Sequence, residues 1–354
     1  MNNIKKKSKY INRIIFKYPS FDKLLKAELC KNNEIDIYIN LEEKELINNL
    51  SDDTENLNPY WVTGLIDGDG TFMLNVSKSS SNLGVSLRPI FSLAVHKSEK
   101  FILDRIKKFF SNVGHIRKSR LYYYYNIDSI KDIKNIIIPH FDKYPLLTIN
   151  KSKSYFLLRS CIELISKNKK NLNENQLLTI LKYKAAFKRG FISKSLGKYQ
   201  NIIPFNINDI PQPPYDKING YWLAGFVAAD GTFGAYKRGG KYKNYYCSFR
   251  ISQDKIDQSL LVYISKYLKC GNVIKEKSGM CELGVYSMLD LNNIIIPFFK
   301  KYKLETSKEI DFFYFCEIVD VFNKKGYKKR WILEDVEKIR FLTLKMNNYR
   351  REIK

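Results

Sequence analysis

Two stretches of the chain decide the fold: Trp61-Val-Thr-Gly-Leu-Ile-Asp-Gly-Asp-Gly-Thr-Phe-Met-Leu-Asn75 and, later, Trp222-Leu-Ala-Gly-Phe-Val-Ala-Ala-Asp-Gly-Thr-Phe-Gly-Ala-Tyr236. In each stretch an apolar segment, predicted to be helical, ends in an acidic residue, Asp69 or Asp230, that is followed at once by glycine. A carboxylate at this end of a helix faces unpaired carbonyls and the negative pole of the helix dipole, which is unfavourable unless a cation lies nearby. Two such helix ends brought together would make a divalent-metal site.

The two halves of the chain continue to match beyond these stretches. Asp69 corresponds to Asp230, residues 91–95 to 249–253, Gly114 to Gly271, and residues 135–139 to 293–297, all in the same order along the chain. The spacing between partners stays within 157 to 161 residues, so small changes in loop length account for the drift. Collinear matches of this kind predict an internal duplication.

Each half has the sequence pattern of a helix, two strands, a helix, two strands and a closing helix. Helices are expected at residues 59–68 and 221–229, and strand-like alternation of apolar and polar residues follows the first of them. The predicted fold is therefore α+β: two pseudosymmetric αββαββα domains, each with a four-stranded antiparallel, saddle-like sheet. The expected divisions are 1–58, an extension of unknown role; 59–203, the first domain; 204–218, a linker stiffened by Pro211, Pro213 and Pro214; and 219–350, the second domain.

Composition indicates the class of partner. The formal net charge of +25 and the isoelectric point near 9.6 favour a polyanion, with nucleic acid ahead of an anionic membrane. No apolar run reaches the roughly 18 residues that a membrane span needs. Six scattered cysteines without a C-x-x-C pair predict free thiols, and three histidines argue against a zinc cluster.

Small residues lie four positions apart in both opening helices: Gly64 and Gly68 in one, Gly225 and Ala229 in the other. This spacing places them on one helix face, where two backbones can approach closely. We expect the two helices to pack against each other across a pseudo-twofold axis, with Asp69 and Asp230 at adjacent ends. The glycines that follow, at positions 70 and 231, are expected to adopt the left-handed conformation that ends many helices.

Residues 62–70 and 223–231 resemble the LAGLIDADG signature of homing endonucleases, and the similarity extends over residues 59–350. The resemblance implies a monomeric enzyme with two motifs, encoded in an organellar intron, that makes a double-strand break in a long, asymmetric DNA target. It implies a mitochondrial location first and a chloroplast second. The last acid of each motif, Asp69 or Asp230, would bind Mg²⁺, with two or three ions per site. The earlier acid is Asp67 in the first copy and Ala228 in the second; this position is not usually a metal ligand.

The resemblance also implies an outer ring of polar and basic side chains that orders water and stabilises phosphate charge. Gln253 fits this role in the second half. The corresponding residue of the first half is Val95. Lys308 is the best basic candidate. Its counterpart is Lys151 if one residue was inserted in the first copy, and Asn150 if none was. Either lysine could instead contact a phosphate or lie in solvent.

One face of each sheet is expected to read DNA in the major groove, because the groove admits β-strands. If Phe72, Leu74 and Val76 face the core, polar side chains of the same strands face the DNA. The candidate DNA-binding residues on the sheet faces are Asn75, Ser77, Arg88, Ser92, Tyr236, Arg238, Ser248 and Arg250; the hairpins that follow add Arg117, Arg120, Lys275 and Lys277.

Two rival functions remain open at this point. Some relatives of this kind bind group I intron RNA and assist splicing as maturases, and the basic surface suits that role as well. A DNA-binding regulator on a decayed scaffold is the other alternative. The presence of both Asp69 and Asp230 favours cleavage, because a protein that only binds has no need of the pair.

Overall fold

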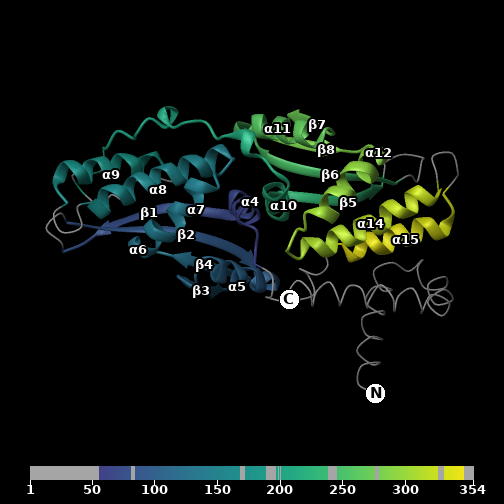
Figure 1. The fold of residues 1–354 in the computed structure, drawn as a ribbon, viewed down its shortest axis with the longest axis horizontal. Coiled ribbons are helices and arrows are strands. Elements are labelled where there is room, and N and C mark those ends of the chain that lie inside the picture. Colours follow the sequence, from purple (N-terminus) through teal and green to yellow (C-terminus); the bar gives the residue numbers. More distant parts are fainter. Residues whose placement is uncertain are drawn as a thin grey trace, which may run out of the picture. The chain divides into compact units, whose positions relative to one another are not determined.

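The structure, a computed structural model, describes residues 56–80, 84–167, 172–188, 197, 199, 201–237, 245–275, 279–325 and 331–346. They belong to the compact unit Leu50–Lys354, which contains both halves of the duplication (Figure 1). The predicted extension at 1–58 lies outside the described residues except for its last three positions.

The first half begins with a helix that leads directly into a strand. Its elements are α4 (Pro59–Asp69), β1 (Gly70–Lys78), β2 (Val85–His96), α5 (Lys100–Phe109), β3 (His115–Ser119), β4 (Tyr122–Ile127), α6 (Ile130–Asp132), a π-helical turn (Ile133–Ile137), α7 (Ile138–Lys143), α8 (Ile149–Lys167) and α9 (Glu174–Ala186). The sheet order is β1-β2-β4-β3, and every neighbouring pair is antiparallel.

The second half repeats this order. Its elements are α10 (Gly220–Asp230), β5 (Gly231–Lys237), β6 (Tyr245–Asp254), α11 (Gln258–Leu268), β7 (Asn272–Lys275), β8 (Met280–Val285), α12 (Met288–Asp290), a π-helical turn (Leu291–Ile295), α13 (Ile296–Lys301), α14 (Lys308–Lys325) and α15 (Leu333–Lys345). The sheet order β5-β6-β8-β7 is that of the first sheet. The duplicated α+β fold is thereby confirmed, and the helices beyond the predicted pattern are α6, α7 and α9 in the first half and α12, α13 and α15 in the second.

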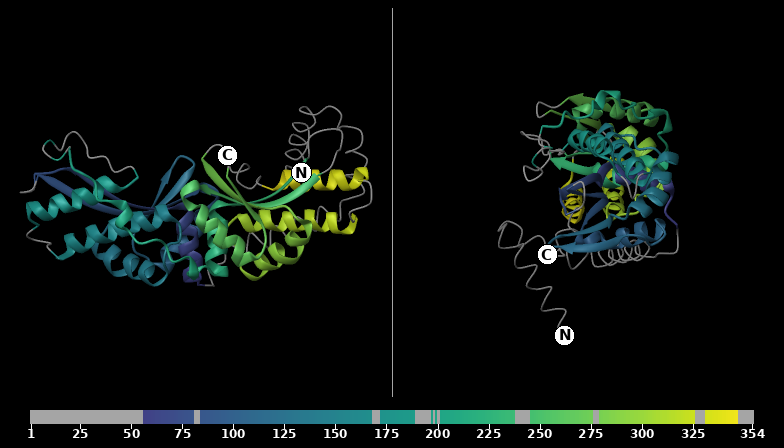
Figure 2. Two further views of the ribbon diagram at one scale, coloured as in Figure 1. Left: turned by 90° about the horizontal axis from the view of Figure 1, so that it is seen from above. Right: turned by 90° about the vertical axis from the view of Figure 1, so that its left-hand side faces the viewer.

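Helices cover one face of each sheet and leave the other face open (Figure 2). Strand alternation sets this division: Phe72, Leu74 and Phe91 are buried on the helix side. Phe233 and Phe249 occupy the corresponding positions in the second half, where their ring centroids lie 5.2 Å apart. The predicted core face of the first sheet is confirmed.

Helices α4 and α10 pack against each other with their backbones in contact. A Cβ atom added at Gly64 would lie 2.0 Å from the carbonyl oxygen of Trp222, and one added at Gly225 would lie 2.0 Å from that of Trp61. Side chains larger than hydrogen are therefore excluded at both positions. The helices begin at asparagine N-caps, Asn58 and Asn219, whose side chains accept backbone hydrogen bonds.

The conformation predicted for Gly70 and Gly231 is wrong. Gly70 has φ −69° and ψ 162°, and Gly231 has φ −80° and ψ 157°, so both are extended and begin a strand. Glycine is needed here for space instead. A Cβ at Gly70 would lie 2.4 Å from Ile66 Cγ2, and one at Gly231 would lie 2.4 Å from Val227 Cγ1.

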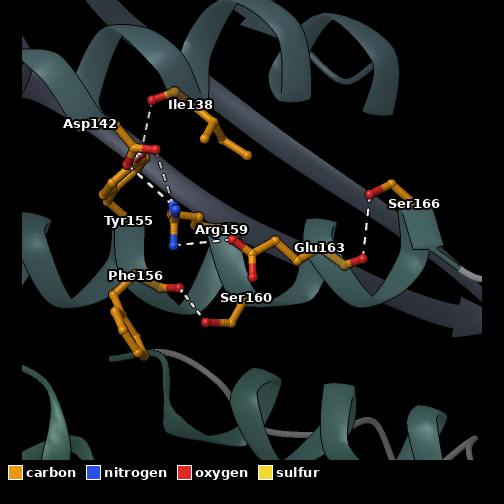
Figure 3. A network of polar contacts seen from close by, with 8 residues as sticks. All are labelled: Ile138, Asp142, Tyr155, Phe156, Arg159, Ser160, Glu163 and Ser166. Atoms are coloured by element: carbon orange, nitrogen blue, oxygen red, sulfur yellow. Dashed lines mark hydrogen bonds and ion pairs between the residues drawn. The ribbon is translucent and has the colours of Figure 1, made fainter.

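The long helix α8 is fastened to α7 by a polar network (Figure 3). The Tyr155 hydroxyl donates to Asp142 at 2.6 Å, and the Arg159 guanidinium lies 3.2 Å from the same carboxylate. Arg159 also pairs with Glu163 one turn further along, at 3.0 Å. This bracing fixes α8, whose first turn carries Lys151.

Two predictions from composition can be compared with the described residues. Cys161, Cys247, Cys270, Cys281 and Cys316 are free thiols, as expected, whereas Cys30 lies outside the described part. Among the described helices, none combines the length and the apolar character that a membrane span requires.

Candidate functional site

Asp69 and Asp230 lie together at the adjacent ends of α4 and α10. A Cβ at Gly68 would lie 3.1 Å from Asp230 Oδ2, so one helix end is in contact with the carboxylate of the other. Asp69 reaches solvent at the surface, yet the protein around its carboxylate removes part of its hydration. This burial, together with repulsion from Asp230, raises the pKa of Asp69 to about 6. Burial also raises the pKa of Asp230. Two acids that resist ionisation side by side form a site that a cation would stabilise.

Two lysines lie at the same helix ends. Lys308 Nζ donates to the carbonyl oxygens of Ala229 at 3.2 Å and Gly231 at 2.5 Å. Lys151 Nζ donates to the carbonyl oxygen of Gly70. The two cations therefore occupy equivalent places at the negative poles of α10 and α4. Lys151, rather than Asn150, is the geometric counterpart of Lys308, which indicates one inserted residue in the first half.

Burial lowers the pKa of Lys151, while the nearby carboxylates of Asp67, Asp230 and Asp69 act in the opposite direction. Lys308 is 6% exposed. Both ammonium groups thus lie in a partly dehydrated environment, where a charge acts more strongly on a neighbouring anion than it does in water.

Gln253 is in direct contact with one of the two acids. Its Nε2 donates to Asp230 Oδ2 at 2.7 Å, which lowers the pKa of Asp230 against the effect of burial and orients the carboxylate. Val95, its first-half counterpart, is 6% exposed and carries no polar group. The two halves of the site therefore differ in the side chain that lies next to the acid.

The donors present suit a hard divalent cation. Mg²⁺ prefers oxygen ligands and is usually held by one or two carboxylates together with substrate phosphates and water. Asp69 and Asp230 supply two carboxylates, and the described residues contain no group of three or more His, Cys, Asp or Glu gathered to hold a metal. Such a site fits an ion that completes its coordination with DNA and water.

Asp67 has a structural role that the sequence did not reveal. Its buried carboxylate accepts from Leu147 N at 2.6 Å, Thr148 N at 3.0 Å and Thr148 Oγ1 at 2.8 Å, just before α8 begins. It also accepts from Trp222 Nε1 of the other half at 3.0 Å. The difference between Asp67 and Ala228 therefore affects contacts between distant segments, because Asp67 connects α4, the start of α8 and α10.

A second pair of acids joins the halves crosswise. Asp257, in the second half, accepts from Ile149 N at the start of α8 at 2.6 Å. Glu99, in the first half, accepts from Ser307 N just before α14 at 3.3 Å. Each lysine-bearing helix thus begins at an acid supplied by the other half. The only sequence signal was that Glu99 and Asp257 lie 158 residues apart, in register with the duplication.

Strand register places the first-half candidates on the open sheet face. Asn75 lies opposite Arg88, and Ser92 lies opposite both Thr71 and Asn126. Ser77, Arg117 and their strand partners Ser86 and Tyr124 have the same orientation. Arg88 Nε donates to Asp128 at 3.0 Å, and Arg120, with φ 43°, lies in the turn between β3 and β4.

The second-half candidates are distributed differently. Tyr236, Ser248 and Arg250 share the open face, but Ser248 is fully buried and its hydroxyl has no partner among the described residues. Lys275 is exposed but pairs with Cys281, a helix-side position. Arg238 and Lys277 lie outside the described residues. The roles of all these residues stay predictions.

Comparison with models of known protein families identifies the family of this chain. A family model described as LAGLIDADG endonuclease matches residues 62–162 and 223–319, one region in each half. The chain belongs to the LAGLIDADG endonuclease family. Each matched region begins within the helix that ends at Asp69 or at Asp230.

Three curated proteins from fungi are similar to this chain. The chain is 31% identical over 287 residues to probable intron-encoded endonuclease 2 of Neurospora crassa, covering 77% of this chain and 62% of the relative. It is 28% identical over 268 residues to probable intron-encoded DNA endonuclease 1 of Mycosarcoma maydis, covering 72% and 96%. Mitochondrial protein RF1 of Saccharomyces cerevisiae is 26% identical over 307 residues, covering 80% and 59%. The chain thus spans less than two thirds of some of these relatives.

Solved structures of LAGLIDADG homing endonucleases share this fold over most of the chain. The homing endonuclease I-SmaMI bound to cleaved DNA superposes with a TM-score of 0.77 at 32% identity, covering 83% of this chain and 98% of I-SmaMI. The same enzyme bound to an uncleaved DNA target in the presence of calcium ions gives a TM-score of 0.74 at 32% identity, covering 82% and 99%. Both neighbours hold DNA.

Proposed function

We propose that the protein is a site-specific, divalent-metal-dependent endonuclease that cleaves both strands of a double-stranded DNA target. The observation that carries the proposal is the pair of carboxylates, Asp69 and Asp230, at adjacent helix ends with a lysine beside each. The family match and the DNA-bound structural neighbours support the same activity. The names of the relatives favour DNA cleavage over RNA maturation.

Asp69 and Asp230 would hold the metal, which we propose to be Mg²⁺ in two or three copies. Bound ions would supply a polarised water and neutralise charge on the phosphate. The side chains of this chain do the rest: Gln253 holds the Asp230 carboxylate in one orientation at 2.7 Å. Lys151 and Lys308 place positive charge beside the acids, where it stabilises the additional negative charge of the phosphate in the transition state.

The DNA would lie along the open faces of the two sheets, one half of the target on each. We propose that the polar side chains predicted for these faces contact base edges and phosphates. The net charge of +25 implies strong attraction to DNA and a steep loss of affinity with salt. Because the chain carries both motifs, a single copy suffices, and we propose a monomer. The mitochondrial relative supports a mitochondrial site of action.

The test is a plasmid-cleavage selection with Mg²⁺, followed by assays of Asp69→Asn and Asp230→Asn on the recovered target. Each substitution removes a charged metal ligand, so double-strand cleavage should fall by at least about 100-fold, while binding in Ca²⁺ persists. Asp104→Asn, at an exposed acid paired with Lys100, is the matched control and should cut normally.

Cleavage that survives either change would remove the metal-site argument. Protection of intron RNA by the protein in footprinting, without any DNA cleavage, would support the maturase alternative instead.

A further inference from the structure

The open face of the second sheet carries a connected row of side chains that runs from β5 to the end of β8. The Arg250 guanidinium lies over the ring of Tyr236, with its carbon 4.8 Å from the ring centroid, and donates to the Tyr236 hydroxyl. On its other side Arg250 pairs with Glu282 at 3.6 Å. Glu282 in turn accepts from Tyr286 Oη at 2.9 Å and from Ser252 Oγ at 3.3 Å. Arg250 is held from two directions.

Two glycines make room for this row. Gly234 and Gly284 each precede a tyrosine of the row by two residues, and so share its face of the sheet. A Cβ at Gly234 would lie 2.4 Å from Tyr236 Oη, and one at Gly284 would lie 2.4 Å from Tyr286 Cε2. Each ring therefore lies across its glycine. The Gly-x-Tyr pattern on both flanks of Arg250 thus lets Tyr236 lie against the guanidinium and lets Tyr286 reach Glu282.

The first half has no equivalent of this row. The positions 158 residues earlier hold Ser92 in place of Arg250 and Tyr124 in place of Glu282. The first sheet instead has Arg88 paired with Asp128 near its surface, with side-chain exposures of 55% and 29%. The fold therefore does not require the row, since the first sheet forms without it.

Glu282 is out of place on a surface that is proposed to bind a polyanion. Its side chain is only 10% exposed, against 30% for Arg250, and it brings negative charge to the DNA-facing side. Such a charge weakens DNA binding unless it serves another purpose. Burial and the hydrogen bond to Glu282 raise the pKa of Tyr286 to about 12, so its hydroxyl stays protonated as a donor. The Glu282 carboxylate is thus held in place by the Tyr286 hydroxyl and pairs with the Arg250 guanidinium.

We propose that Arg250 reads a guanine in the half-site facing the second sheet, and that Glu282 is the positioning residue that holds its guanidinium for this contact. The proposal rests on the proposed function. Arginine donates two hydrogen bonds to guanine O6 and N7 in the major groove, and a contact of this kind discriminates only if the fork is aligned. The side chain of Arg250 remains 30% exposed beside these contacts, so its guanidinium can still be reached from the open face of the sheet.

The experiment measures binding in Ca²⁺ to the target recovered by plasmid cleavage, and to a panel of duplexes that each carry one substituted base pair. Wild-type protein should show one G·C position in the second half-site that depends on Arg250, identified with Arg250→Lys. Glu282→Gln should lower discrimination at that same position about 10-fold. It should leave affinity for the intact target unchanged or stronger, because a negative charge facing DNA is removed.

Three further proteins complete the design. Arg250→Lys combined with Glu282→Gln should lose no more discrimination than Arg250→Lys alone, because both changes act on one contact. Tyr286→Phe, which removes only the hydroxyl that donates to Glu282, should weaken discrimination at that position less than Glu282→Gln does. Asp128→Asn, which changes an acid to an amide beside Arg88 on the other sheet, is the matched control and should leave that position unaffected.

Retained discrimination in Glu282→Gln would overturn the proposal. So would an equal loss of affinity for every duplex, which indicates a structural role alone. Loss of discrimination in Glu282→Gln at a different base pair, one that Arg250→Lys leaves unaffected, would also overturn the proposal, because Glu282 itself would then accept from a cytosine. If the wild-type protein bound and cut no duplex, the proposed function would fail first, and this proposal with it.

Discussion

Trp61 and Trp222 occupy equivalent positions in α4 and α10, and both are almost fully buried. Trp222 Nε1 donates to Asp67 at 3.0 Å. Trp61 Nε1 is buried without a hydrogen-bond partner among the described residues. Ala228 stands where an acid equivalent to Asp67 would lie. The two halves thus keep the same apolar contact between helices but differ in the polar contact behind it.

This difference shows which part of the duplicated interface the fold requires. The close approach at Gly64 and Gly225 is the same in both directions. The acid is present in one half only, and a buried indole N–H left without an acceptor costs about 1 to 3 kcal/mol. Packing of the backbones therefore defines the interface, and Asp67 adds a connection to the start of α8.

The largest expected effect comes from removing that connection. Asp67→Ala leaves the donors of Leu147, Thr148 and Trp222 without an acceptor in a buried environment. We expect the free energy of unfolding to fall by about 3 to 5 kcal/mol. Urea denaturation of the variant and the wild type measures this difference. A loss below about 1 kcal/mol would show that the network contributes nothing beyond packing.

The two tryptophans provide a matched pair. Both Trp222→Phe and Trp61→Phe remove indole volume, but only the first leaves Asp67 with one donor fewer. Trp222→Phe should therefore destabilise the protein by about 1 to 3 kcal/mol more than Trp61→Phe. Thermal and urea unfolding of the two variants side by side give the comparison. Equal losses would mean that the hydrogen bond to Asp67 has no net value.

The smallest expected effect on stability concerns Asp257, the second-half acid that accepts from Ile149 N of the first half. Burial raises its pKa to about 6, against the effect of the hydrogen bond from Ile149 N. The folded protein therefore holds a proton more tightly than the unfolded chain, so this group favours folding at low pH, and its contribution declines as pH rises from about 4 through about 6. Asp257→Asn does not titrate and can still accept from Ile149 N.

Relative to wild type, Asp257→Asn should consequently gain about 1 to 2 kcal/mol of stability between pH 4 and pH 7.5. Urea titrations of both proteins at the two pH values measure the gain. A difference between variant and wild type that does not change with pH would contradict the assigned burial of this carboxylate.

Local sequence patterns predicted much of this architecture. The helix that ends at Asp69, the alternation of Phe72 and Leu74, and the duplication itself are all periodic features, and the structure confirms them. The placement of Lys151 opposite Lys308 required only a choice between two alignments. These features could be predicted because each depends only on the order and spacing of residues along the sequence.

The remaining features depend on contacts between distant segments. Asp67 meets Thr148 across 81 positions, and Glu99 meets Ser307 across 208. No periodic signal marks such a pair. The prediction for Gly70 was wrong for a related reason. Glycine is required there because Ile66 Cγ2, in the preceding helix turn, leaves no space for a Cβ, and not because of a turn motif.

The contact at Gly64 and Gly225 has a consequence for how such a protein changes over generations. A mutation at either glycine forces two backbones apart and is lost together with the fold. A mutation at Asn75 or Ser77, exposed on the open sheet face, leaves the core untouched. Mutations in the central helix pair are therefore eliminated, whereas mutations on the open sheet faces are tolerated. If these faces bind DNA as proposed, a lineage of such chains can adopt new DNA targets while its central helix pair stays the same.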